Sequence, residues 1–182
     1  LVALAVRLDS PGPALFRQER LGKDRRPFTV LKFRSMYVDA DEAVHRWAVR
    51  QFAAGRPVAV VDGKPQYKPS DDPRITRVGR FIRTTGLDEL PQLINVIRGE
   101  MSLVGPRPAI PYELEHYQEW HYRRFAVPPG ITGLWQVRRG PETSLEDMVR
   151  QDVEYIQSVS PWLDLKILLA TVPVVLFKRC AF

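Results

Sequence analysis

The sequence predicts a small, mostly helical α+β domain, and three observations support this prediction. Of the 182 residues, 45% are hydrophobic and 26% are charged, a balance that suits one globular domain with an apolar core. Alternation of apolar and polar residues is confined to a short region near the start, whereas helical spacing prevails afterwards. The 16 prolines amount to about 9% of the chain, against a usual ~5%, and separate the elements. We expect one domain of ordinary size, residues 1–182.

Two strand-like runs near the start flank a polar turn. Residues 15–21 and 28–34 form the runs, and residues 22–26 between them are one glycine and four charged residues. This arrangement predicts a short β-hairpin. Apolar side chains fall on both faces of the second run, so we expect that strand to be half covered. Residues 56–73 have loop composition, with a short strand at 58–61 as an alternative.

Two helices are predicted in the first half of the chain after the hairpin. Residues 39–54 carry apolar side chains at helical spacing, and Gly55 is a typical stop. A second helix is expected to begin after Thr85 and to end at Gly99, because its apolar residues form one stripe. The members of this stripe are Leu90, Leu93, Ile94 and Ile97.

The second half of the chain predicts two more helices and a loop. Residues 109–125, which are rich in aromatic side chains, form a third helix candidate. Ser144 and Asp147 have the spacing of a capping box, which indicates the start of a fourth helix. Residues 128–137 predict a rigid proline-glycine loop followed by an apolar, strand-like run.

Charge and cysteine content restrict the function. The 27 Lys and Arg residues exceed the 21 Asp and Glu residues by six, which favours an anionic partner such as a phosphate, a nucleic acid or an acidic lipid. The single cysteine, Cys180, excludes an intramolecular disulfide framework and a cysteine-based zinc site. His45, His116 and His121 lack metal-ligand spacing, so we interpret them as structural. Neither a phosphate-binding P-loop nor a dinucleotide motif is present.

Two apolar segments bear on membrane attachment, and neither is a complete membrane span. Residues 1–6 are all apolar but far short of the roughly 20 that span a bilayer. Residues 162–177 are almost wholly apolar but are interrupted by two charged residues and by Pro173. We expect residues 109–125 and 162–177 to lie in the headgroup region as amphipathic segments.

The pair Asp88 and Glu89 is the most informative candidate site, and it allows two interpretations. In the first, Thr85 caps a helix, Asp88 completes its capping box, and both acids merely favour the positive end of the helix. In the second, they hold Mg²⁺ or attack phosphorus. From Arg74 to Arg107 there are six arginines against three acids, and arginine binds phosphate oxygens with a planar fork. For Arg74 itself, and for Arg77, a solvated or lipid-facing surface is the better interpretation.

Several motifs in one order make the sequence resemble the bacterial sugar transferases, the monotopic phosphoglycosyl transferases that act on polyprenyl phosphates. The resemblance extends over essentially the whole chain. The matching segments are residues 10–22, 28–36, 72–80, 87–93 (LDELPQL), 101–108 (MSLVGPRP), 129–133 and 162–168.

The resemblance implies a reaction and a set of residues. A sugar 1-phosphate, with a hexose as the sugar, passes from a UDP-sugar to a polyprenyl phosphate such as undecaprenyl phosphate, with release of UMP, and begins exopolysaccharide or other glycoconjugate synthesis. Asp88 would be the nucleophile that forms a covalent phosphosugar intermediate, and Glu89, with Asp88, would hold Mg²⁺. The residues expected to bind substrate phosphates are Arg83, Arg107, Lys32 and Arg34. Those expected to shape the site are Pro106, Pro108 and Gln136.

The resemblance also implies a location, the cytoplasmic face of the bacterial plasma membrane, and no nucleic-acid partner. Residues 1–8 correspond to the last part of a re-entrant membrane helix that is largely missing here. Many members of the family read Trp-Gln-Val-Ser-Gly-Arg where this chain has arginine earlier, at Arg138 and Arg139, so we assign the family's phosphate-binding role at this place to neither. The rival hypothesis is a non-catalytic basic module that binds acidic lipids or nucleic acid.

Overall fold

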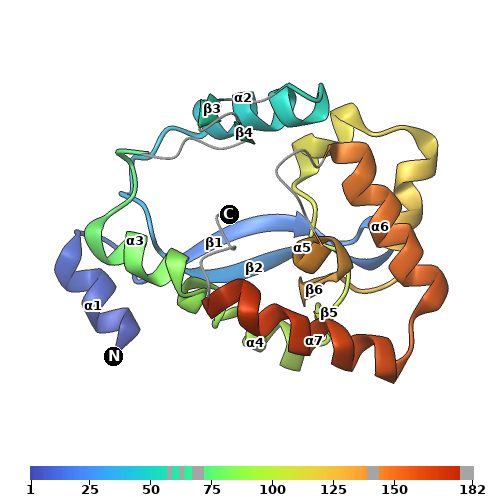
Figure 1. The fold of residues 1–182 in the computed structure, drawn as a ribbon. Helices are drawn as coiled ribbons and strands as arrows, with labels where there is room; N and C mark the ends of the chain where they lie inside the picture. Colours follow the sequence, from blue (N-terminus) through green and yellow to red (C-terminus); the bar gives the residue numbers. More distant parts are fainter. Residues whose placement is uncertain (57–58, 62–63, 67–71, 139–143, 177–182) are drawn as a thin grey trace.

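A long β-hairpin lies at the centre of the molecule, and short helices surround it (Figure 1). The computed structural model describes residues 1–56, 59–61, 64–66, 72–138 and 144–176. The α-helices are α1 (Val2–Asp9), α2 (Glu42–Ala53), α3 (Arg77–Thr84), α4 (Gln92–Ile97), α5 (Leu134–Arg138), α6 (Leu145–Ser158) and α7 (Pro161–Leu176). The 3₁₀ helices are η1 (Lys23–Arg25), η2 (Leu87–Glu89), η3 (Pro111–His116) and η4 (Glu119–Ala126). The strands are β1 (Leu15–Leu21), β2 (Pro27–Phe33), β3 (Ala59–Val61), β4 (Lys64–Gln66), β5 (Ser102–Val104) and β6 (Gly130–Thr132).

The described strands pair two by two. β1 and β2 are antiparallel, with Leu15 opposite Phe33 and Leu21 opposite Pro27, so the predicted hairpin is confirmed. β3 and β4 form a second antiparallel pair, and β5 and β6 form a parallel one. The mixed α+β fold class with little strand is therefore also confirmed.

The core forms around α6, which packs between the other helices. On one side Tyr155 of α6 lies with Val104 of β5 and Ile167 of α7. On another side Met148 and Val149 pack against Trp135 of α5. The helix begins as predicted, because the Ser144 hydroxyl accepts from the Asp147 N–H and the Asp147 carboxylate accepts from the Ser144 N–H. The helix predicted for residues 39–54 is confirmed as α2.

The prediction of a helix starting after Thr85 is wrong. Thr85 instead ends α3, with its hydroxyl donating to the Phe81 carbonyl, and Gly86 follows with φ of 69°. A residue with positive φ terminates a helix, and glycine adopts this conformation without steric cost. Asp88 therefore lies in the separate turn η2 and makes no capping box with Thr85, while α4 begins only at Gln92. The preceding helix α3, which carries three of the arginines of the series, was not predicted from the sequence.

Two other predicted elements differ in type. The helix expected over residues 109–125 is two 3₁₀ helices, because Gln118 has extended backbone angles that separate η3 from η4. Residues 128–137, expected to be a loop followed by a strand-like run, contain the short strand β6 and then the helix α5. A tight turn precedes it: a Cβ at Gly133 would lie 2.2 Å from the Gly105 carbonyl oxygen, so only glycine fits this approach.

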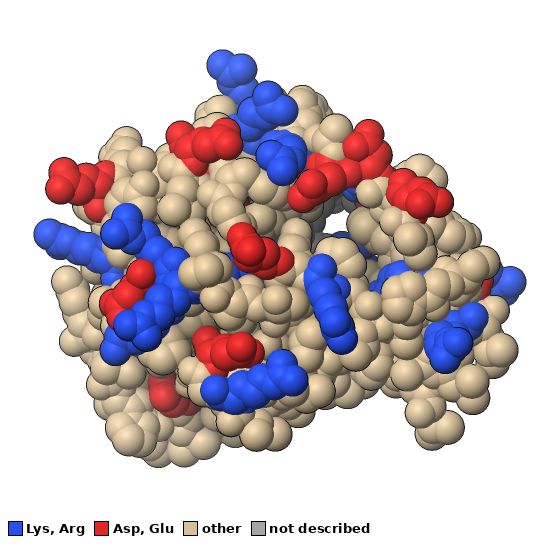
Figure 2. All heavy atoms as spheres, turned by 180° about the vertical axis from the view of Figure 1, so that it is seen from behind, with Lys and Arg blue, Asp and Glu red and all other residues tan. Residues whose placement is uncertain are grey.

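Exposed apolar side chains gather on α1, α3, α4 and α7, the helices that lie along the lower side of Figure 1. They include Leu4, Leu8, Phe81, Leu93, Ile94, Ile97, Trp162, Leu165, Leu169 and Val172. Figure 2 shows lysine, arginine and acidic side chains spread over the rear face, whereas its lower rim is nearly free of them. Among the described residues, no helix is both long and apolar enough to cross a bilayer.

Candidate active site

Asp88 and Glu89 lie on the short turn η2, which packs against α3 and β2. The turn is possible because Gly86, with φ of 69°, reverses the chain directly after α3. The Glu89 N–H donates to the Gly86 carbonyl and closes the turn at 3.2 Å. Both carboxylates thus lie on a short turn between the helices α3 and α4, and each of these helices is attached to β2.

The neighbour on one side, α3, is attached to the end of β2. The Thr76 hydroxyl caps the helix by accepting from the Gly79 N–H at 2.9 Å, and the Thr76 N–H donates to the Ser35 carbonyl at 3.1 Å. A Cβ at Gly79 would lie 2.0 Å from that same carbonyl oxygen. The close approach fixes the direction of α3 and therefore the position of Arg83 in its last turn.

The neighbour on the other side, α4, is attached to β2 by Asn95, which is completely buried. Its amide oxygen accepts from the Leu31 N–H at 3.1 Å, and its amide nitrogen donates to the Thr29 carbonyl at 2.7 Å and to the Glu100 carboxylate at 2.7 Å. Both donors and the acceptor of the side chain are used, as burial requires. Asn95 thus holds the helix that follows the acidic pair against the strand that carries Lys32.

Two cationic side chains, Lys32 and Arg83, act on the two carboxylates of the acidic turn. The Lys32 ammonium donates to Glu89 Oε1 at 2.6 Å, with both side chains partly exposed. Burial raises the pKa of Asp88, and Glu89 adds to the rise, whereas Lys32 and Arg83 work to lower it. For Arg83, which is a cation, burial instead lowers the pKa, and the Asp88 carboxylate opposes that change. The structure therefore brings together Lys32, Arg83, Asp88 and Glu89 of the predicted site.

Hydrogen bonds to the carbonyls of Pro106 and Pro108 hold the loop around Arg107 in place. The Pro106 carbonyl accepts from the Gly130 N–H at 2.9 Å, and the Pro108 carbonyl accepts from Arg20 Nη1 at 2.9 Å. Between them Arg107 Nη1 donates to both carboxylate oxygens of Glu113, at 3.1 and 3.2 Å. Pro106 and Pro108 therefore shape this loop, and Arg107 stands in an ion pair.

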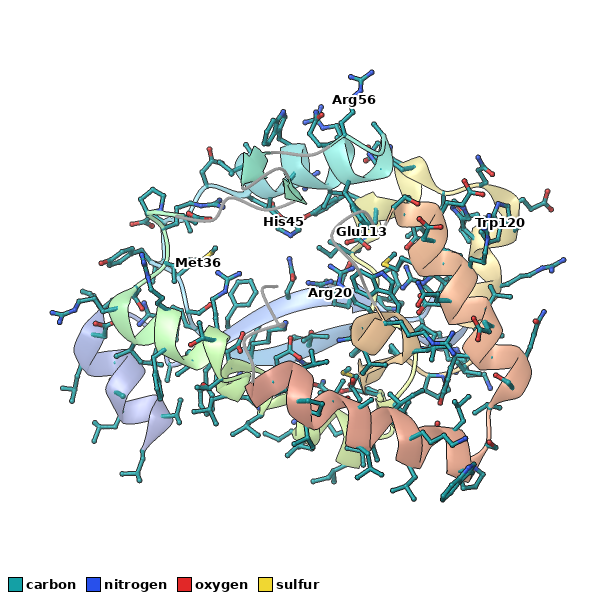
Figure 3. The ribbon with its side chains drawn as sticks, in the orientation of Figure 1. Arg20, Met36, His45, Arg56, Glu113 and Trp120 are labelled. Carbon is teal, nitrogen blue, oxygen red and sulfur yellow. The ribbon has the colours of Figure 1, made fainter. Side chains whose placement is uncertain are left out.

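Beneath this loop lies a buried network of charges that the sequence did not reveal. Arg124 Nη2 donates to the Arg107 carbonyl at 2.9 Å and lies 2.7 Å from Asp152 Oδ2, with both side chains at most 3% exposed. Arg124 Nη1 also donates to the Tyr117 hydroxyl. Burial works to raise the pKa of Glu113, but Arg107, Arg20 and Arg124 together lower it. Figure 3 shows Arg20 and Glu113 on the side of the hairpin that faces α2, which carries His45.

Arg34 lies apart from this chemistry. Its Nε donates to the Pro13 carbonyl at 2.7 Å, Nη1 donates to the Ser10 hydroxyl at 2.6 Å, and Nη2 donates to the Ser10 carbonyl at 2.8 Å. These contacts hold the proline-rich turn before β1 against the end of β2. We therefore leave Arg34 out of the phosphate-binding set.

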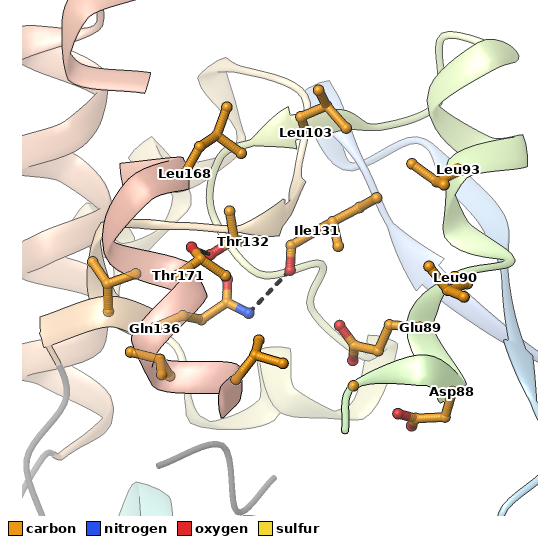
Figure 4. A pocket seen from close by; sticks show the side chains of 14 residues that line it. Asp88, Glu89, Leu90, Leu93, Leu103, Ile131, Thr132, Gln136, Leu168 and Thr171 are labelled. Carbon is orange, nitrogen blue, oxygen red and sulfur yellow. Dashed lines mark hydrogen bonds between the residues drawn. The ribbon is translucent and has the colours of Figure 1, made fainter. Parts of the chain in front are cut away.

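An apolar pocket of about 240 Å³ adjoins the acidic turn (Figure 4). Asp88 and Glu89 lie at one end of it, and Gln136 and Thr171 lie across from them. Gln136 Nε2 donates to the Ile131 carbonyl at 3.1 Å, so this predicted site-shaping residue fixes one wall. The other lining residues are Gly86, Leu90, Leu93, Leu103, Thr132, Val137, Leu168, Val174 and Val175.

Other predicted residues have local partners. Arg138 forms an exposed ion pair with Glu154 at 2.7 Å, and Arg139 lies outside the described residues. His45 hydrogen-bonds to the Tyr112 hydroxyl, and His121 Nδ1 accepts from the Gln118 N–H at 3.1 Å. Among the described residues, no three His, Cys, Asp or Glu side chains gather as a metal site.

The positioning residues that the sequence did not reveal are Asn95, Glu113, Arg124 and Asp152. Their sequence signals are weak or absent. Asn95 lies outside the apolar stripe of α4, whereas Asp152 lies among apolar residues of α6. Such placement predicts a buried polar contact, because polar groups are buried only when partnered. It does not identify the partner.

The chain is similar to known proteins over most of its length. A model of the family described as "Bacterial sugar transferase" matches residues 1–178, so the chain belongs to the bacterial sugar transferase family.

One relative is the UDP-galactose-lipid carrier transferase of Erwinia amylovora, 46% identical over 94% of this chain and 35% of its own length. Another is the UDP-glucose:undecaprenyl-phosphate glucose-1-phosphate transferase of Caulobacter vibrioides, 45% identical over all of this chain and 64% of its own length. A third is the exopolysaccharide production protein ExoY of Sinorhizobium fredii, 37% identical over all of this chain and 78% of its own length. The chain thus spans about a third of several of the curated relatives that it matches, among them the Erwinia protein.

Proposed function

We propose that this chain is a catalytic domain that transfers a sugar 1-phosphate from a UDP-sugar to a polyprenyl phosphate. The observation that carries the proposal is the partly buried Asp88 carboxylate, which lies beside Glu89 and is acted on by the two cations Lys32 and Arg83. The names of the relatives, a UDP-galactose-lipid carrier transferase and a glucose-1-phosphate transferase, support the class of substrates. An aliphatic pocket beside these charges suits a reaction between a nucleotide sugar and a lipid.

In the first step Asp88 attacks the β-phosphorus of the UDP-sugar. A bond forms between Oδ of Asp88 and phosphorus, and the bond to the bridging oxygen breaks, so UMP leaves with the electron pair. A carboxylate needs no general base for this attack, because it is already ionised. Lys32 and Arg83 are the cations of this chain that offset the repulsion between the carboxylate and the diphosphate.

In the second step the acceptor phosphate displaces the enzyme. An oxygen of the polyprenyl phosphate bonds to the same phosphorus, the bond to Asp88 breaks, and the carboxylate is restored. The product is a polyprenyl diphosphate sugar. Two displacements with a small, fixed nucleophile divide a difficult transfer between two anions into two easier ones.

The residues on η2 fit a magnesium ion. Mg²⁺ prefers oxygen ligands and is held in many enzymes by one or two carboxylates together with substrate phosphates and water. Asp88 and Glu89 provide two adjacent carboxylates, and Lys32 contacts only one oxygen of Glu89. When bound, Mg²⁺ would neutralise charge on the phosphates.

We further propose that the domain acts at the cytoplasmic face of a bacterial plasma membrane. The exposed apolar side chains of α1, α3, α4 and α7 would lie in the interface, and the acidic turn connects α3 to α4. With these side chains in the interface, the carboxylates would lie near the level of a lipid phosphate. This arrangement leaves the remaining surface to contact the nucleotide sugar from water.

The test is release of UMP from UDP-glucose or UDP-galactose, with undecaprenyl phosphate in detergent, and with Mg²⁺ added or chelated. We expect Asp88→Asn to lower the rate at least about a thousandfold, because the nucleophile is lost at nearly constant size. Glu89→Gln is expected to be nearly as damaging. The control is Glu154→Gln, a surface change far along α6 that should leave the rate unchanged.

The covalent step has its own measurement. With UDP-sugar and no lipid acceptor, intact-protein mass spectrometry should show a hexose-phosphate adduct that is absent from Asp88→Asn. If this variant kept more than a few per cent of UMP release, Asp88 would not be the nucleophile. If UMP release were absent for every UDP-sugar while nucleic acid bound with steep salt dependence, the chain would instead be a basic binding module.

A further inference from the structure

We propose that the pocket between η2, α4, β5, β6 and α7 binds the phosphate-proximal isoprene units of the lipid acceptor. This inference rests on the proposed function, and it assigns the lipid and the sugar to different sides of Asp88. Asp88 and Glu89 close one end of the pocket (Figure 4). A lipid whose hydrocarbon lies in the pocket therefore brings its phosphate to the acidic turn.

The chemistry of the lining selects hydrocarbon. The Thr171 hydroxyl donates to the Ile167 carbonyl at 2.8 Å, so in its 2.8 Å contact with Thr132 it must accept. The Gln136 amide nitrogen donates to the Ile131 carbonyl. Most polar groups of the walls are thus occupied, and the remaining lining residues beyond Asp88 and Glu89 are aliphatic or glycine.

A sugar ring fits this lining poorly. Each sugar hydroxyl that is buried without a partner costs roughly 1–3 kcal/mol of unfavourable desolvation. Away from the two carboxylates at one end, the walls offer few polar groups, and the unpartnered Gln136 Oε1 is itself buried. These walls give the hydroxyls of a hexose few partners, whereas an isoprene unit requires none.

The size and the opening agree with one end of a long chain. The volume of about 240 Å³ lies below the roughly 300–1,000 Å³ of pockets that enclose whole small molecules. Leu90, Leu93 and Leu103 line the pocket yet are 42–47% exposed, so the mouth opens to the surface. At that mouth begins the exposed apolar face of α4 and α7, along which the rest of the chain can leave.

The test compares variants inside and outside the pocket with a short, soluble acceptor, farnesyl phosphate. Leu103→Asn and Leu93→Asn are expected to raise the KM for farnesyl phosphate about tenfold, because both lose apolar contact with the bound chain. Exchange of labelled UMP into UDP-sugar, which uses no lipid, should stay within about twofold. The matched control, Val159→Asn, changes an exposed apolar residue that follows α6, outside the pocket, and should alter neither quantity.

A second measurement does not depend on catalysis. Farnesyl phosphate should raise the Tm of the wild-type protein and of Val159→Asn, and should raise that of Leu103→Asn much less. Equal responses of all three proteins would overturn the proposal, and so would a rise in the KM for UDP-sugar instead of the acceptor. If the Tm pattern held while UMP release failed, the lipid site would stand and the proposed function would fall.

Discussion

Two clusters of charged side chains in this fold consist of the same types of residue but differ in burial and in pairing. Arg124 and Asp152 are 1% and 3% exposed and lie 2.7 Å apart, whereas Lys32 and Glu89 are 28% and 18% exposed at 2.6 Å. In the first cluster Arg124 is matched by a carboxylate, a phenol and a backbone carbonyl. In the second cluster burial raises the pKa of Asp88 in spite of the nearby cations.

The difference teaches how the fold divides structure from chemistry. In the buried cluster Arg124 fixes the backbone of Arg107, because it donates to the Arg107 carbonyl oxygen while it pairs with Asp152. Incomplete pairing on η2 leaves carboxylate oxygens available for a substrate or a cation. Removing a partner should therefore destabilise the protein in the first cluster and change its chemistry in the second.

The largest effect on stability is expected from Arg124→Met. The change leaves Asp152 buried without its cation, which lowers the free energy of unfolding by about 3–5 kcal/mol. Urea denaturation followed by circular dichroism measures it. Asp152→Asn is the matched control and should cost less, because burial already raises the pKa of Asp152 to about 6 and Arg124 keeps its bonds to Tyr117 and Arg107. A loss below about 1 kcal/mol for Arg124→Met would show that the network does not hold the fold.

An effect on chemistry without a comparable loss of stability is expected from Lys32→Met. Lys32 lowers the pKa of Asp88, so its removal raises that pKa further above the ordinary carboxyl value. Attack requires ionised Asp88, and activity falls as pH drops through this pKa. The acid limb of kcat/KM for UMP release should therefore move to higher pH. Lys32→Arg keeps the charge and should largely restore the limb; an unchanged limb in Lys32→Met would contradict the electrostatic coupling.

The smallest effect is expected from Glu154→Gln. Its ion pair with Arg138 has the same 2.7 Å distance as the buried pair, but both side chains are more than half exposed. Exposed pairs contribute about 0–1 kcal/mol, because water screens them and the side chains lose freedom. Thermal unfolding at low and high salt should therefore place this variant close to the wild-type protein. A loss comparable to that of Arg124→Met would mean that distance matters more than burial.

The sequence predicted elements whose signals are local. The hairpin, α2 and the capping box of α6 follow from alternation, helical spacing and one Ser-Asp pair. Asp88 and Glu89 could be proposed as a site because two adjacent acids among arginines suit a metal ion bound to phosphate. The start of the helix near Thr85 was missed, because capping residues are common and the conformation of Gly86 depends on packing. The buried network was missed because its members are far apart in the chain.

Asn95 has a consequence for the behaviour of this protein among copies of itself. β1 covers one edge of β2, and the other edge would present free backbone groups to any passing strand. Asn95 occupies the Leu31 N–H and the Thr29 carbonyl on that edge with a side-chain amide that imitates a neighbouring peptide group. At the opposite edge of the hairpin, the Leu21 N–H is occupied by the Ala109 carbonyl. Backbone groups on both edges of the hairpin that carries Lys32 are thereby occupied at these positions, which disfavours intermolecular strand pairing there.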